Sequence, residues 1–164
     1  MTIKDQLTAV QSALETWAEN EGGRAYIASD RVHLYDLIGL SQGKPTVVAL
    51  FMGETIRGEF EVAAALGRVD RQFLAVISRG RGMKANPADS LVQDGGGGKP
   101  MFELVESVRD IIRTLELDPD TTERPIDYKG IAPVDFGENT RTDAYQIEFS
   151  IGTALPVVGS QADT

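Results

Sequence analysis

The sequence predicts an α+β fold in which an N-terminal and a central amphipathic helix flank a mainly antiparallel β-sheet. Two observations support this prediction. Apolar residues between positions 101 and 115 recur at the spacing of one helical stripe, whereas those between 143 and 151 alternate with polar residues, as in a half-exposed strand. The chain has 164 residues, so we expect a single domain over residues 1–156 and a short flexible tail over 157–164.

The central helix is predicted over residues 100–116, and its stripe closes the core. The stripe consists of Met101, Leu104, Val105, Val108, Ile111, Ile112 and Leu115. Pro100 suits the first helical position, where no backbone hydrogen bond is lost, and Glu103 is favourable in the first turn. Asp118 precedes Pro119, which disfavours helical geometry in the residue before it and ends the segment.

A second helix is predicted near the N-terminus, because apolar residues again follow helical spacing. They are Ile3, Leu7, Val10, Leu14 and Trp17. Thr2 is a suitable N-cap, and Gly22 with Gly23 ends the segment. Residues 23–45 contain scattered apolar side chains without a stable period, so we expect a loop with short elements there.

Five segments read as strands. Residues 46–52 form an apolar run typical of a central strand, and residues 55–62 alternate as a half-exposed strand that makes a hairpin with it. Residues 71–78 give a third strand, followed by a long loop over 79–99. Residues 126–136 and 143–151 form a C-terminal hairpin that turns at 137–139, and Pro133 places the first of these strands at a sheet edge or bulge.

Composition excludes several kinds of site. The chain has no cysteine and one histidine, so we expect no disulfide and no cysteine- or histidine-based metal site. The formal net charge of −9 argues against sequence-specific nucleic-acid binding, which needs a basic face. No segment is apolar enough to span a membrane and no signal peptide begins the chain, so we expect a soluble protein made in a cytoplasm.

Three features invite a catalytic or ligand-binding interpretation, and none completes a known motif. The run Gly95–Gly98 before Lys99 lacks the first glycine of a phosphate-binding loop, and Pro100 replaces its Ser or Thr. An acidic turn lacks the glycine and ligand number of a calcium loop; its residues are Asp118, Asp120 and Glu123. His33 has no visible partner for general-base work. We therefore expect no enzyme activity and no cofactor.

The order of elements resembles that of the tail terminator (tail completion) proteins of long-tailed bacteriophages. The closest local resemblance is in SVRDIIRTLEL (107–117), IDYKGIAPVDFG (126–137) and AYQIEFSIGTALP (144–156). A closing strand of the type Tyr-x-Ile-x-Phe is typical of these proteins, as is an upstream strand end like VISRGRG that leads into a loop ordered on assembly. The resemblance covers residues 1–156.

The resemblance implies a structural virion protein without catalysis. Such proteins form a hexameric ring on the head-proximal end of the tail tube, stop its polymerisation and join it to the head connector. Their partners are further copies of themselves, the tail tube protein, the connector and DNA that passes through the lumen. Assembly takes place in the host cytoplasm. An acidic lumen would let DNA slide.

Candidate assembly contacts lie in the loop and on the exposed face of the predicted strand 55–62: Arg57, Glu59, Arg79, Arg81, Met83 and Lys84. Two alternatives remain open. One is another neck or tail protein, either a tail tube protein or a head–tail joining protein. The other is a small enzyme or ligand-binding domain that uses the acidic turn or His33.

Overall fold

The computed structural model describes residues 1–40, 43–56, 67–80, 92, 99–117, 126–135 and 142–155. Within this part the chain forms helices and strands in the order α1 (Ile3–Glu21), β1 (Arg24–Ala28), α2 (Arg31–Leu40), β2 (Thr46–Ile56), β3 (Arg68–Gly80), α5 (Met101–Arg113), β4 (Asp127–Pro133) and β5 (Thr142–Ala154). The strands form one sheet in the order β1-β2-β3-β5-β4. Only the β1–β2 pair is parallel among these strands, which confirms the expected mainly antiparallel α+β fold.

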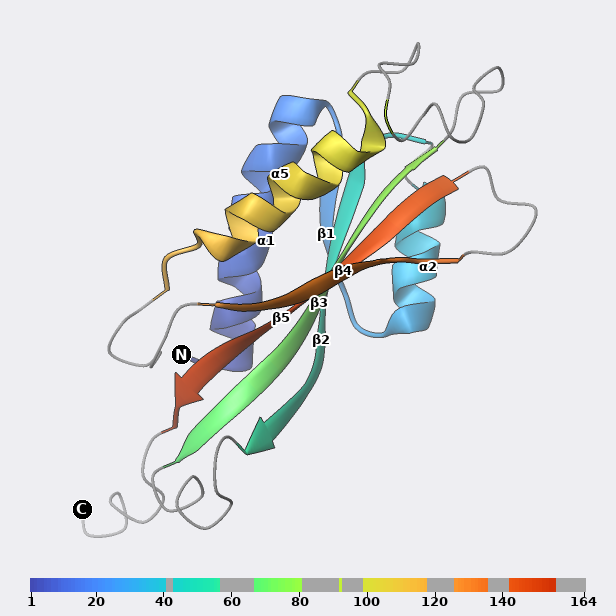
Figure 1. Cartoon of the computed structure of the whole chain (residues 1–164). Coiled ribbons are helices and arrows are strands. Elements are labelled where there is room, and N and C mark those ends of the chain that lie inside the picture. The colour runs from blue at the N-terminus through green and yellow to red at the C-terminus, as the bar shows by residue number, and fades with distance from the viewer. Residues whose placement is uncertain are drawn as a thin grey trace, which may run out of the picture.

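The elements form three layers. Helices α1 and α5 cover one face of the sheet, here called the α1/α5 face, and α2 covers part of the opposite face, the α2 face (Figure 1). The ends of β2, β3 and β5 extend below α2 in the same view. One sheet therefore separates two apolar cores of unequal size.

The larger core lies between the sheet and the two helices of the α1/α5 face. At its centre the rings of Phe73 and Phe149 stack with centroids 5.5 Å apart on the paired strands β3 and β5. Helix α5 contributes the predicted stripe, in which Met101, Leu104, Val105, Val108 and Ile112 are buried. The two helices are joined by a hydrogen bond of 2.8 Å from Trp17 Nε1 to Ser107 Oγ.

The smaller core lies beneath α2. It consists of Ala28, Leu34, Ile38, Val48, Leu50, Leu74, Val76 and Ala144. The alternation along β2 explains the division, because Val47 and Ala49 face the larger core while Val48 and Leu50 face the smaller one. A strand buried on both faces reads as a continuous apolar run, as residues 46–52 do.

Both predicted helices are confirmed, with small differences at their ends. Thr2 caps α1: its hydroxyl accepts from the Asp5 backbone, and the Asp5 carboxylate accepts from the Thr2 backbone. Gly22 ends the helix at φ 68°, in the left-handed region that glycine favours. Helix α5 ends at Arg113 rather than at residue 116, and Pro100 occupies its N-cap position.

The expectation of a loop with short elements over residues 23–45 is correct in the short elements and wrong in the loop. Most of this segment forms β1, which pairs in parallel with β2, and the ten-residue helix α2 that connects the two strands. Such a parallel pair needs a crossover connection, and α2 supplies it. The side chains of α2 are apolar on both the buried and the exposed side, so they show no simple helical stripe.

The predicted hairpin between residues 46–52 and 55–62 is also wrong in its described part. Strand β2 continues through Gly53 to Ile56 and pairs with β3 throughout. Gly53, at φ 149°, lies next to a register shift in this ladder, so it marks a bulge within a strand and no turn. Residues 57–66 lie outside the described part.

The C-terminal hairpin partners are confirmed. Strand β4 lies at the edge of the sheet and pairs antiparallel with β5, as Pro133 at its end predicts. The inward residues of β5 include Ile147, Phe149 and Ile151, as the alternation predicts. The predicted turn at 137–139 and the tail at 157–164 lie outside the described residues.

Candidate assembly surface

Arg79 is the one candidate contact residue within the described part. It lies near the end of β3 opposite Asp143 of β5, and it is 9% exposed. Its Nη1 donates to the backbone carbonyl of Lys99, beside the start of α5. Burial lowers the pKa of the guanidinium, and the charge of Asp143 opposes this shift. Arg79 therefore holds the fold together at this end of the sheet and presents little surface to a partner.

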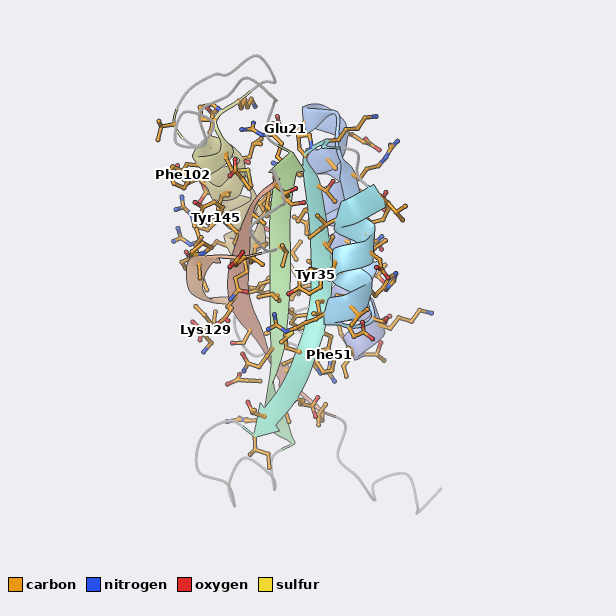
Figure 2. All side chains as sticks on the ribbon, turned by 90° about the vertical axis from the view of Figure 1, so that its right-hand side faces the viewer. Glu21, Tyr35, Phe51, Phe102, Lys129 and Tyr145 are labelled. Atoms are coloured by element: carbon orange, nitrogen blue, oxygen red, sulfur yellow. The ribbon has the colours of Figure 1, made fainter. Side chains whose placement is uncertain are left out.

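The Arg79–Lys99 contact is part of a larger connection. Lys99 Nζ donates to Glu21 Oε1 at 2.8 Å, which ties the residue before Pro100 to the end of α1 (Glu21 is labelled in Figure 2). This hydrogen bond raises the pKa of Lys99. Both ends of the segment 79–99 are therefore fixed to the body of the protein, by β3 on one side and by Lys99 on the other.

The other sequence-based candidates lie outside the described residues. They are Arg57, Glu59, Arg81, Met83 and Lys84, together with the glycine run 95–98 and the acidic turn at Asp118, Asp120 and Glu123. Their proposed roles stay predictions. A basic tip made by Arg79 and Arg81 together would have to rely on Arg81, because the Arg79 guanidinium contacts its own chain.

His33 has a structural role at the start of α2. Its Nδ1 accepts from the Ser29 backbone at 3.0 Å, and its backbone N–H donates to Asp30 Oδ1 at 2.8 Å. These two bonds close the first turn of the helix in the manner of a capping box. The imidazole nitrogen that a general base would use is thus engaged with backbone.

Sequence reasoning missed the exposed side of α2, because residues 23–45 were interpreted as a loop. This surface, here called the α2 outer surface, consists of Arg31, Val32, Tyr35, Asp36, Gly39 and Leu40. Val32 and Leu40 are each 70% exposed and Tyr35 is 43% exposed. The spacing 32, 35 and 39 places three residues along one line of a helix, but this line can be recognised only once the segment is known to be helical.

A second surface is the part of the α2 face that α2 leaves uncovered. Figure 2 shows α2 on one side of this face beside β2, with β3 and β5 further across the sheet and no helix in front of them. This uncovered half is polar, with Gln72, Gln146, Glu148, Asp127 and Lys129 around the centre of β5. Lys129 Nζ lies 3.2 Å from Asp127 Oδ2. Carboxylates and amides thus line this half.

Neither surface forms a metal centre or a membrane-spanning segment in the part of the chain that is described. No cluster of three or more His, Asp or Glu side chains there is arranged to hold a metal ion. No described helix has the length and apolar character needed to cross a membrane. The fold and its surfaces define a mainly antiparallel α+β protein with exposed apolar side chains on α2 and on β2.

Comparison with known proteins assigns no family. No family model matches the chain, and no curated protein matches it. Among solved structures, the mycobacterial sensor histidine kinase MprB is similar at a TM-score of 0.33 and 12% sequence identity, over 90% of this chain and 95% of that chain. A similarity at this level carries no argument about function.

Proposed function

We propose that the protein is a structural virion protein, a tail terminator that forms a ring on the head-proximal end of a phage tail tube. In this role it stops tube polymerisation and joins the tube to the head connector. The proposal rests on the resemblance of element order. In its support, the described chain begins with an amphipathic helix on a sheet, continues through α5 and ends with the β4–β5 hairpin.

The structural observation that supports this resemblance-based proposal is the exposure of large apolar side chains at separate places. Met52 and Ile56 are exposed on the half of β2 that extends past α2, and Phe102 is exposed on α5. Single exposed apolar residues are ordinary, but groups of them mark interaction surfaces. A ring closes through head-to-tail contacts, which need two different surfaces on each subunit.

Charge supports a lumen that does not retain DNA. The net charge of −9 and the carboxylates on the uncovered half of the α2 face repel phosphates. Affinity for duplex DNA depends on the number of phosphates that basic side chains neutralise. In a ring through which DNA passes, the absence of such contacts keeps the DNA free to move.

The test is the native mass of the purified protein with and without tail tubes, followed by electron microscopy of the mixture. We expect rings, or caps confined to one end of each tube, and tubes that no longer elongate. Long tubes assembled from the pure protein would instead identify a tube protein. A monomer that ignores tube ends, yet is stabilised by a nucleotide or divalent metal, would support a ligand-binding domain.

Two matched variants test whether the end of β2 belongs to the contact surface. Ile56→Asp places a charge on the exposed end of β2, and we expect it to reduce capping while the circular dichroism spectrum stays unchanged. Thr8→Asp adds the same charge at an exposed position of α1 and serves as the control. Equal capping by both variants would remove the β2 end from the contact surface.

A further inference from the structure

Several residues of the α2 outer surface lower the stability of the single chain, and no contact within the described part of the chain compensates for this. Arg31 occupies the first turn of α2, where a cation opposes the helix dipole. Gly39 is the last but one residue of the helix, and a Cβ there would meet nothing within 4 Å. Glycine costs up to about 0.5–1 kcal/mol relative to alanine in a helix, and this upper value applies to a helix interior. Val32 and Leu40 remain largely in water.

Five of the six residues of this surface fit the pattern by which two parallel helices pair, and Leu40, at position b, lies outside the seam. Val32, Tyr35 and Gly39 are spaced i, i+3 and i+7, which are successive a, d and a positions of a heptad. On the same helix Arg31 falls at g and Asp36 at the following e position. Positions g and e′ five residues apart form the ion pairs between helices in parallel coiled coils. Neither Arg31 nor Asp36 has an ion-pair partner among the described residues of its own chain.

We propose that the α2 outer surface binds the same surface of a second copy of this chain, with the two α2 helices parallel about a two-fold axis. In this arrangement Val32 and Tyr35 pack against their counterparts, and Gly39 lets the two backbones approach closely. Arg31 of each copy lies beside Asp36 of the other, so the ion pair forms twice. The surface is therefore complementary to itself in both shape and charge, as a two-fold contact requires.

The opposite side of α2 leaves room for this pairing. Leu34 and Ile38 face the sheet and are buried in the smaller core, so the outer surface points away from the protein's own body. Figure 2 shows α2 as the outermost layer on this side, with Tyr35 labelled on it. An antiparallel pair would not form the two ion pairs. It places position g beside g and position e beside e, so Arg31 of one copy would not lie beside Asp36 of the other.

The contact is small. A helix of ten residues is about 15 Å long, so its outer side buries far less than the roughly 800 Å² per partner of a standard interface. We expect a weak dimer that forms as protein concentration rises. It is a two-fold contact, whereas a ring uses head-to-tail contacts, so it does not depend on the proposed function and either can fail alone.

A charge exchange tests the proposal by sedimentation velocity of the purified full chain over a range of concentrations, without tail tubes. Arg31→Asp or Asp36→Arg alone places like charges together at two symmetric positions, and we expect the dimer dissociation constant to rise about tenfold or more. The double variant R31D/D36R restores both pairs in reverse, and its dissociation constant should return to within about threefold of the original.

Lys4→Asp is the control, because it makes the same kind of change in the first turn of another helix, at an exposed residue of α1. It should leave the dissociation constant unchanged. A protein that stays monomeric at every concentration would overturn the proposal. So would a dimer that both single variants weaken and the double variant does not restore, since its charges would then meet a different surface.

A second measurement uses the absence of cysteine from the native chain. Val32→Cys places one thiol at an a position, where symmetry brings it against its own copy. Mild oxidation should give a disulfide-linked dimer, whereas Thr8→Cys on α1 should give little. Equal cross-linking of the two variants would contradict the two-fold contact even if Val32→Cys weakens the dimer.

Discussion

At the scale of single residues, the buried Arg71 side chain donates three hydrogen bonds to three different residues. Its Nε donates to Glu54 at 3.0 Å, and its Nη1 donates to the Met1 carbonyl at 2.8 Å and to Gln6 Oε1 at 3.1 Å. Gln6 in turn donates to Thr153 Oγ1 at 2.8 Å. These hydrogen bonds connect the start of α1 to β2, β3 and β5, near the ends of the strands that extend past the helices.

Removing Arg71 should therefore destabilise the whole domain. Arg71→Ala leaves the buried Gln6 and the Met1 carbonyl without a donor, and we expect a loss of about 3 kcal/mol in the free energy of unfolding. Urea denaturation measures it. The exposed pair of Lys129 and Asp127 gives the control, since Lys129→Ala should cost no more than about 0.5 kcal/mol. Equal losses in the two variants would contradict a cooperative buried network.

The capping box of α1 gives a pH dependence. The backbone and hydroxyl hydrogen bonds from Thr2 lower the pKa of the Asp5 carboxyl group below its ordinary value. Its ionised form thus stabilises the folded state, so this contribution is complete above the ordinary value and is lost as the pH falls through the lowered one. We expect the urea midpoint of Asp5→Asn to depend less on pH below pH 4 than that of the native protein. Identical slopes would show that the box contributes nothing.

At the scale of elements, close backbone approaches decide where glycine is required. Gly80 ends β3 and donates to the Gly43 carbonyl at 3.1 Å, and a Cβ on Gly80 would lie 2.7 Å from Gly43 Cα. Gly80→Ala must push two backbones apart, so we expect a loss of about 1–3 kcal/mol. Gly39→Ala meets no atom and improves helix propensity, so it should gain up to about 1 kcal/mol. Thermal unfolding of the two variants should shift in opposite directions, and a shift of the same sign would refute this assignment.

The elements that the sequence predicted correctly are those whose buried apolar residues recur at the period of a helix or a strand. The stripes of α1 and α5 face one sheet, so each is amphipathic by itself, and β5 alternates because its two faces differ. Strand β1 has five residues, and its parallel partner β2 begins eighteen residues after β1 ends. Its identity therefore depends on a long-range pairing that no local pattern reveals. A hairpin was predicted from the two strand-like segments on either side of Gly53, and the structure has a bulge there within one continuous strand.

The candidate contacts were less predictable than the fold, and Arg79 shows why. From the sequence it is a cation beside glycine at the end of a strand, as an exposed tip would be. Its environment is set by Asp143, which lies 64 residues away, and by the carbonyl of Lys99. The α2 outer surface was missed for the opposite reason, since its residues look ordinary until the helix is known.

At the scale of the whole molecule, one sheet separates a large core from a small one. Because α2 covers only part of its face, the rest of that face needs polar side chains, and Gln72, Gln146 and Glu148 supply them. Ser150 is buried on this half, and its Oγ has no hydrogen-bond partner. Ser150→Ala removes an unsatisfied polar group. We therefore expect the free energy of unfolding, measured by urea denaturation, to fall by less than about 0.5 kcal/mol or to rise.

The charge of the whole molecule gives the last prediction. With 25 acidic and 16 basic residues, the chain carries a net charge of −9, so it repels DNA at long range and more strongly at low salt. We expect no shift of duplex DNA in gel electrophoresis at low ionic strength, at protein concentrations where dimers or rings form. A protein that binds DNA through a basic patch behaves in the opposite way, because its affinity rises steeply as salt falls. Salt-dependent retention of DNA would therefore contradict a lumen past which DNA slides, and it would direct attention to the lysine and arginine residues between positions 79 and 99.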